Sequence, residues 1–352
     1  MAIDVKSAFQ QLATDKRAIQ SVKDIAVKKY TTPTVDDIFT VIPNIKGGQQ
    51  VAAMKGIEYV TTKEDGCGGT SLNPTFPALS QEWNPRRAKI KIKMCYTDFE
   101  QYFTQWGLGN GYDVHNLEES DFFDFIVDLT TDAMRKDTTR IVLLGDKDIA
   151  TQNILNDANK VKFYDIIDKG LISTLQYFKT IPELSDNFVS ISQNSAASAA
   201  LQMTFGEADA FNLFYDLTEE ADFDGNQLLS SGKLAANYKK YLRAWQLESS
   251  KEQIQKGMPD LIVNGERLAI VKDYDRWRKN DFKAVASPNL TQLPHFALFS
   301  AKESLQVGVD SAQALEDLRF EYVGGDDEHI YIKGNYMIDF KMVNPYDFRA
   351  AL

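Results

Sequence analysis

Cysteine and histidine are scarce in this sequence, and those present lack the spacing of ligands. The 352 residues include two cysteines, Cys67 and Cys95, and three histidines, His115, His295 and His329. A structural zinc site takes four Cys or His ligands, usually in closely spaced pairs, and these five residues lie too far apart to predict one. The cysteines are typical of free thiols in a reducing cytoplasm, although a disulfide stays open. His295 lies beside an apolar run, which favours a hydrogen-bonded core residue.

Long hydrophobic runs and the common catalytic motifs are also missing. No apolar stretch approaches the roughly 18–20 residues of a membrane span, and the first twenty residues contain no secretory core. The sequence has no GxxxxGK[ST] phosphate loop and no GxSxG elbow. The glycines of GLGNGYD (107–113) end a predicted helix and do not open one, which argues against a dinucleotide loop. A catalytic triad assembled from distant residues stays open, but nothing marks out a nucleophile.

The charge balance is acidic. Lys and Arg total 39 and Asp and Glu total 50, so the formal net charge is −11. A chain of this charge does not bind DNA through a general positive field and would repel nucleic acid placed against it. This property suits a container for nucleic acid better than a clamp. With 43% hydrophobic residues and this length, about two globular domains are expected.

The first hundred residues favour extended and irregular structure after an initial helix. Residues 4–30 predict a mildly basic helix, and residues 31–46 predict an extended connector with a strand. Residues 47–96 are rich in glycine and proline. They contain two strand-like runs, 56–62 and 88–96, separated by about twenty-five residues. So long and polar an excursion is poorly stabilised alone, which indicates that it lies across a neighbour or forms a surface loop.

The strongest helix signal lies at residues 117–140. Phe122, Ile126, Leu129 and Ala133 recur at i, i+4, i+7 and i+11 and predict one apolar face. A second row of residues along this predicted helix is acidic. It indicates a solvated face or a set of salt-bridge partners, although it could also form a carboxylate site. It consists of Asp121, Asp124, Asp128 and Asp132. A strand is expected next, at residues 141–146.

The remaining sequence mixes helices and strands. Residues 163–178 and a helical pattern around 202–221 belong to this mixed part. Residues 233–247 predict a strong helix, and residues 260–271 predict a hairpin around Asn264-Gly265.

The last sixty residues are β-rich. Strands are expected at 294–300, 318–323 and 330–343, and residues 344–348 are expected to close the sheet. The acidic turn Asp326-Asp327-Glu328 is expected to be a solvated hairpin tip, with a hard-cation site as the alternative.

Several residues are predicted to make contacts between subunits, and none is assigned to catalysis, metal binding or cofactor binding. An aromatic ring beside arginines is the composition of an interface hot spot, or alternatively of a small cluster packed under the loop. The glycine cluster of the excursion and two cations of the first helix complete the set. The predicted assembly residues are Trp83, Pro85, Arg86, Arg87, Gly66, Gly68, Gly69, Lys16 and Arg17.

The order of these parts resembles the Hong Kong 97-type major capsid proteins of tailed bacteriophages. The resemblance is carried by a basic helical arm, a glycine-rich excursion, a long spine helix, a mixed domain and a β-rich return. It is most specific in SAKESLQVGVD (300–310) and LRFEYV…IYIKGNYMIDFKMVNPYDF (318–348). WNPRRAKIKIKMCYTDFEQYF (83–103) is also similar to capsid sequences from phages of Bacteroidetes hosts.

The resemblance implies an α+β capsid fold with a definite division of the chain. The implied parts are an N-terminal arm (1–46), an extended loop (47–96), a peripheral domain with the spine helix (97–153), an axial domain (154–280) and a β-rich return to the peripheral domain (281–352).

The resemblance also implies a structural, non-enzymatic role. Hexamers and pentamers would assemble in the bacterial cytoplasm into an icosahedral virion shell around double-stranded DNA, without sequence-specific binding. A separate scaffolding protein is expected, because the segment before the excursion is short. A portal and possible decoration proteins are further partners. The alternatives are an encapsulin-like compartment shell or a cytoplasmic enzyme.

Overall fold

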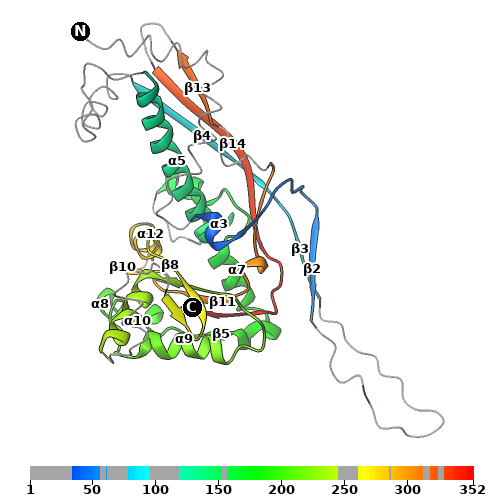
Figure 1. The fold of residues 1–352 in the computed structure, drawn as a ribbon, viewed down its shortest axis with the longest axis vertical. Helices are drawn as coiled ribbons and strands as arrows, with labels where there is room; N and C mark the ends of the chain where they lie inside the picture. Colours follow the sequence, from blue (N-terminus) through cyan, green and yellow to red (C-terminus); the bar gives the residue numbers. More distant parts are fainter. Residues whose placement is uncertain are drawn as a thin grey trace, which may run out of the picture.

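The structure is a computed structural model with an α+β fold, as the sequence predicted. It describes residues 34–55, 61, 78–95, 119–152, 157–244, 261–284, 287–311, 318–323 and 329–352. Figure 1 shows a long ribbon of strands beside one helix, a compact domain at the lower end of this ribbon, and a two-stranded arm that projects to one side. Within the described residues, no helix is both long enough and apolar enough to cross a membrane.

The ribbon is a five-stranded sheet organised around one long strand, β14 (His329–Met342). The C-terminal half of that strand pairs antiparallel with β12, and its N-terminal half pairs with β13. Its other edge pairs with β4 from Arg86 to Cys95. A fifth strand, β1, joins β12 in parallel. The strands are β1 Thr40–Ile42, β4 Arg86–Cys95, β12 Leu305–Val309, β13 Leu318–Val323 and β14 His329–Met342. The strands predicted at 318–323 and 330–343 are confirmed.

The spine helix α5 spans Glu119–Leu144 and lies beside β4 and β14 (Figure 1). Its existence is confirmed, but the strand predicted at 141–146 is wrong, because the helix continues to Leu144. Residues 141–144 are at most 2% exposed. These β-branched and leucine side chains are buried where ribbon and compact domain meet, and this burial outweighs their strand propensity.

The compact domain is built on a six-stranded sheet of order β5-β15-β11-β6-β8-β7. It draws strands from both the middle and the end of the chain. These are β5 Phe188–Val189, β6 Gln227–Ser231, β7 Leu261–Val263, β8 Glu266–Val271, β11 Ala297–Ser300 and β15 Phe348–Ala351. Residues 344–348 were expected to close the same sheet as 330–343. Instead, the chain turns after β14 and β15 enters the compact domain.

Helices cover both faces of this sheet. Alternate residues of β11 separate two cores: Leu298 packs in the larger core with α5 and α7, whereas Ala297 and Phe299 pack in the smaller core with α9 and α10. The described helices here are α6 Ala158–Tyr164, α7 Leu171–Phe178, α8 Ala199–Gln202, α9 Asp209–Glu219, α10 Gly232–Ala244 and α12 Tyr274–Asp281. They confirm the helical pattern predicted around 202–221 and, as far as residue 244, the helix predicted at 233–247, whereas residues 163–178 are divided between α6 and α7.

The hairpin predicted around Asn264-Gly265 is confirmed. Strands β7 and β8 pair antiparallel across it. Both turn residues have positive φ, 49° at Asn264 and 90° at Gly265. A two-residue turn with both φ values positive matches the twist of the flanking strands, and Asn-Gly adopts it at low cost.

The excursion differs from the expected pairing. Strands β2 Gln50–Met54 and β3 Ala78–Glu82 pair with each other, and this ribbon projects from the body in Figure 1. The run 88–96, expected to be a strand of the excursion, instead belongs to β4 and pairs with β14. Most of the run 56–62 and the helix predicted at 4–30 lie outside the described residues. The remaining short elements are α3 Val35–Ile38, β9 Lys283–Ala284 and β10 Ser287–Thr291.

Candidate functional site

The candidate site is the junction where the base of the excursion, the ribbon and the compact domain meet. Four predicted assembly residues lie here: Trp83, Pro85, Arg86 and Arg87. The other five (Gly66, Gly68, Gly69, Lys16 and Arg17) lie outside the described residues. The side chain of Cys95 and the whole of Cys67 also lie outside them.

Trp83 is packed inside its own subunit and is 3% exposed. Its backbone N–H donates to the Gln49 carbonyl at 2.9 Å, and its carbonyl accepts from Gly48 at 3.0 Å. A Cβ added at Gly308 would lie 2.7 Å from the Trp83 ring and 2.5 Å from Ile45, so the ring packs directly against the β12 backbone. The indole therefore anchors the excursion to the ribbon, and an assembly role for Trp83 stays a prediction.

Replacing Trp83 by phenylalanine is expected to lower the free energy of subunit unfolding by about 1–2 kcal/mol. The smaller ring leaves a void against Gly308 that the β12 backbone does not fill. Denaturant unfolding of the isolated subunit measures the loss. Arg87→Ala, at an exposed residue of β4, is the control, with an expected change within about 0.5 kcal/mol. Equal losses in both variants would contradict the anchoring role.

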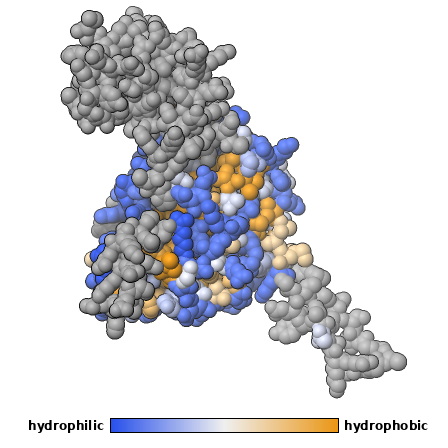
Figure 2. Space-filling view, in the orientation of Figure 1, coloured by the Kyte–Doolittle hydropathy of each residue, from blue (hydrophilic) through white to orange (hydrophobic). Residues whose placement is uncertain are grey.

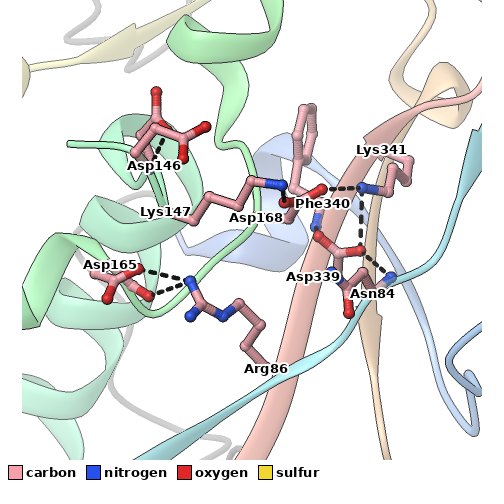
Figure 3. A network of polar contacts seen from close by, with 10 residues as sticks. Asn84, Arg86, Asp146, Lys147, Asp165, Asp168, Asp339, Phe340 and Lys341 are labelled. Atoms are coloured by element: carbon pink, nitrogen blue, oxygen red, sulfur yellow. Dashed lines mark hydrogen bonds and ion pairs between the residues drawn. The ribbon is translucent and has the colours of Figure 1, made fainter. Parts of the chain in front are cut away.

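Arg86 ties the first residue of β4 to the turn after α6. Its guanidinium lies 2.6 Å from the Asp165 carboxylate and also donates to the Asp165 carbonyl at 2.8 Å (Figure 3). Both side chains are more than one-third exposed, so the pair contributes little to stability by itself. The pair instead orients β4, because contacts to both the carbonyl and the carboxylate of Asp165 fix the angle at which β4 leaves the compact domain.

A second group of charges lies beside Arg86 (Figure 3). Lys341 is 3.1 Å from Asp339 and 3.5 Å from Asp168, and Lys147 is 2.8 Å from Asp168. Asp339 also accepts hydrogen bonds from the backbone N–H groups of Asn84 and Phe340, both at 2.8 Å. The network joins the turn after α5, the turn before α7, the base of the excursion and β14.

The pKa values of the two carboxylates in this network are shifted in opposite directions. Burial opposes ionisation of Asp168, but the hydrogen bonds and charges of Lys147 and Lys341 outweigh it and lower its pKa. Asp339 is fully buried, and burial raises its pKa despite Lys341 and the backbone donors. Buried charges of this kind are costly when unpaired, so the network favours one relative placement of the three parts.

A groove of about 400 Å³ opens between β3 and α7. Leu79 and Gln81 lie on one wall and Tyr177 and Phe178 on the other, with Lys341 also lining it. Figure 2 shows hydrophobic side chains gathered where the excursion leaves the body, whereas the lower part of the visible face is mostly hydrophilic.

A separate clamp joins the end of α5 to the compact domain. Asp281 of α12 pairs with Arg140 of α5, accepts from the Tyr164 hydroxyl at 2.7 Å, and lies 3.0 Å from Lys160. Burial opposes ionisation of Asp281, but these donors and cations lower its pKa overall. Burial and the bond to Asp281 raise the pKa of Tyr164, which stays a neutral donor.

His295 lies in the interior, as predicted. It is fully buried, its Nε2 lies 2.7 Å from the Gln202 carbonyl, and its ring packs edge-on against Phe205. Nδ1 lies 3.8 Å from Asp275. Burial lowers the pKa of His295, while its contact with the Gln202 carbonyl acts in the opposite direction.

The free energy of unfolding of Asp275→Asn is expected to increase relative to that of wild type as the pH rises from about 4 to 6. Burial raises the pKa of Asp275 to about 6, against opposing backbone donors at Lys233 and Gly232. Between its usual value and 6, the folded chain holds more protons than the unfolded chain, so wild-type stability falls with rising pH. The difference between variant and wild type should grow by about 2 kcal/mol across this window. Urea unfolding at pH 4, 5, 6 and 7 measures it, and a constant difference would contradict the prediction.

The polar contacts at the junction hold parts of one subunit together: the Arg86–Asp165 pair, the Asp168–Lys341–Asp339 network and the Asp281 clamp. We call these contacts the joint. Among the described residues, no three Cys, His, Asp or Glu side chains gather as metal ligands. The joint residues Arg140, Asp281, Asp168, Asp339 and Lys341 were not singled out from sequence. Their only signal was charge within apolar stretches, which identifies no partner.

Neither family models nor curated proteins match the chain, but solved structures do. A chain in a structure of Gordonia phage Cozz is 11% identical with a TM-score of 0.47, covering 92% of this chain and 87% of that one. A chain of the capsid of a native GTA particle is 12% identical with a TM-score of 0.47, covering 92% and 90%. A chain of the satellite phage P4 procapsid is 12% identical with a TM-score of 0.44, covering 97% and 98%.

Proposed function

We propose that this chain is the repeated subunit of a closed shell, the major capsid protein of a tailed bacteriophage. In this role it forms hexamers and pentamers that enclose double-stranded DNA, and it carries out no catalysis. The single observation behind this proposal is the excursion β2–β3. A two-stranded ribbon projecting from the body has little intrinsic stability, and a neighbouring subunit would supply the missing burial.

The exposure of the excursion supports this role. Residues alternate between exposed and partly buried along both strands. Gln50 and Glu82 pair on the exposed face near the body, and farther along the same face presents Ala52, Met54, Ala78 and Ser80, of which Met54 is 63% exposed. Small and apolar side chains on a projecting ribbon allow close approach of another chain.

The joint supports the same role. A shell needs subunits whose parts hold a defined angle, because angular error accumulates over many copies. The Arg86–Asp165 pair, the Asp168–Lys341–Asp339 network and the Asp281 clamp fix the ribbon on the compact domain at three places. The groove beside β3 is too open and too mixed in lining to favour a small-molecule substrate.

Further parts of the proposal concern partners and contact residues. A separate scaffolding protein, a portal and possible decoration proteins are expected, as is a Bacteroidetes host. Trp83, Pro85, Arg86 and Arg87, with the glycine cluster and the two arm cations, are proposed to contribute to subunit contacts. Arg87, which is exposed beside the excursion base, has more accessible surface for such a contact than Trp83. The net charge of −11 would limit adhesion of packaged DNA.

Negative-stain electron microscopy of the expressed protein, with and without its neighbouring phage genes, tests the proposal. Closed shells of uniform diameter are expected. Monomers that persist even with a scaffolding protein would overturn it and support the enzyme alternative, which a substrate screen would pursue. Shells loaded with an enzyme and free of DNA would favour the compartment alternative.

A further inference from the structure

The compact domain carries an acidic surface along α9 and the turn that follows it. Residues 207–224 contain seven carboxylates and no lysine or arginine, and all seven side chains are exposed. They are Glu207, Asp209, Asp216, Glu219, Glu220, Asp222 and Asp224. On α9 itself, Asp209, Asp216 and Glu219 follow at intervals of seven and three residues, so they share one face of the helix. We call this face the acidic stripe.

The next helix, α10, carries a basic surface with the same geometry. Gly232–Ala244 contains no carboxylate, and its exposed Lys233, Lys240 and Arg243 also follow at intervals of seven and three. We call this face the basic stripe. Burial, together with the nearby charges of Lys272 and Arg243, lowers the pKa of the intervening Lys239. Lys239, Arg243 and Lys272 therefore lie close together as cations.

The two stripes do not neutralise each other within one subunit. The helices meet through their other faces, where the tilted rings of Phe211 and Tyr241 have centroids 4.6 Å apart and the Ala210 N–H donates to the Asn237 side chain at 3.1 Å. Within the described part of the chain, Asp216, Glu219, Lys240 and Arg243 form no ion pair. Glu220, which pairs with Arg349 at 2.5 Å, is the exception among the seven carboxylates.

We propose that the acidic stripe of one copy packs against the basic stripe of the next copy, so that compact domains join head to tail in a ring. The inference rests on the proposed shell function and identifies the surfaces that form each ring. Two different patches on one subunit make a heterologous contact, which closes into a ring under rotation. Each stripe spans about 15 Å along its helix, so three charges can face three opposite charges.

The charge of the whole chain makes a second copy the fitting partner. Subunits of net charge −11 repel one another, so they associate most readily where one copy presents a local excess of cations. The basic stripe supplies that excess, and every copy brings an acidic stripe at the same concentration. Opposite charges across such an interface also select its register, because like charges placed together are strongly unfavourable.

Charge reversal tests the contact. The acid-reversed variant is Asp216→Lys with Glu219→Lys, and the base-reversed variant is Lys240→Glu with Arg243→Glu. Each variant alone places like charges together and should yield at least about tenfold fewer rings than wild type by electron microscopy and sedimentation. Mixed in equal amounts, the two restore opposite charges wherever they alternate. The mixture should therefore recover six-membered rings but not five-membered rings, since five copies cannot alternate.

Two controls separate the possible failures. Asp148→Lys with Glu183→Lys changes two exposed carboxylates elsewhere and should assemble as wild type does. Thermal melting of each unassembled subunit checks that the reversed variants fold. Normal assembly of either reversed variant alone, or a mixture of folded variants that forms no rings, overturns the interface while the shell function stands. Wild-type protein that forms neither rings nor shells, even when expressed with its neighbouring phage genes, overturns both.

Discussion

Gly170→Ala is expected to lower the free energy of unfolding of the subunit by at least about 3 kcal/mol. Gly170 precedes α7 and lies against the end of α5. Its N–H donates to the Gly145 carbonyl at 2.8 Å. A Cβ at Gly170 would lie 2.6 Å from the Val142 carbonyl and 3.0 Å from two backbone atoms of Gly145. All three contacts are backbone, so no side chain can rotate away and the two segments must separate.

Gly47→Ala is the matched control for this prediction. Its added Cβ would meet only Pro85, at an ordinary 3.9 Å, so the same substitution should change the free energy of unfolding by less than about 0.5 kcal/mol. Neither glycine has a positive φ, so backbone strain does not enter the comparison. Urea denaturation of both variants measures the difference. Similar stabilities for the two would show that α5 and α7 do not make this close crossing.

Asp281→Ala is expected to lower the free energy of subunit unfolding by about 3 kcal/mol, because it leaves the buried Tyr164 hydroxyl and the mostly buried Arg140 guanidinium without their acceptor. Asp281 is nearly buried and serves Arg140, Tyr164 and Lys160 at once. Removing both ends of the main pair, by Asp281→Leu with Arg140→Met, should cost less than the single change. Unfolding free energies of wild type, single and double variants measure this. A double variant less stable than Asp281→Ala would contradict the account.

The Asp281 clamp also has a pH dependence of known sign. Because the folded protein lowers the pKa of Asp281, the folded state binds its proton less readily than the unfolded state does. The clamp's contribution is therefore complete at neutral pH and declines as the pH falls below the usual carboxyl value of about 4. The stability difference between wild type and Asp281→Ala should shrink between pH 5 and pH 3.

Local patterns in the sequence predicted most elements, because spacing along one segment decides them. The periodicity of Phe122 to Ala133 predicted the spine helix, and Asn264-Gly265 predicted its hairpin. Two errors came from distant partners. Residues 141–144 have strand-forming side chains, yet they are buried as helix at the joint. The alternating lysines of β4 identified a strand but not its partner, which lies about 240 residues later in β14.

The joint could not be predicted in the same way. Asp281, Arg140 and Asp168 are ordinary charged residues in the sequence. Only the fold brings Asp281 to Arg140 and Asp168 to Lys341. Trp83 was recognised as unusual, but its neighbours Gly308 and Ile45 lie far from it in the chain. Composition can identify a residue with a large contact surface, whereas the atoms that cover it depend on the tertiary structure.

The length of the spine helix converts a small rotation at the joint into a large displacement at its far end. With 26 residues, α5 is about 39 Å long, and its side chains clamp the compact domain near one end, around Arg140 and Gly145. A rotation of about 5° at this fulcrum would move the opposite end by about 3 Å over such a length. In a shell of this chain, small differences in the packing of Gly145 against Gly170 would become changes of curvature. In a shell of this chain, the diameter would depend on a few backbone contacts well inside each subunit.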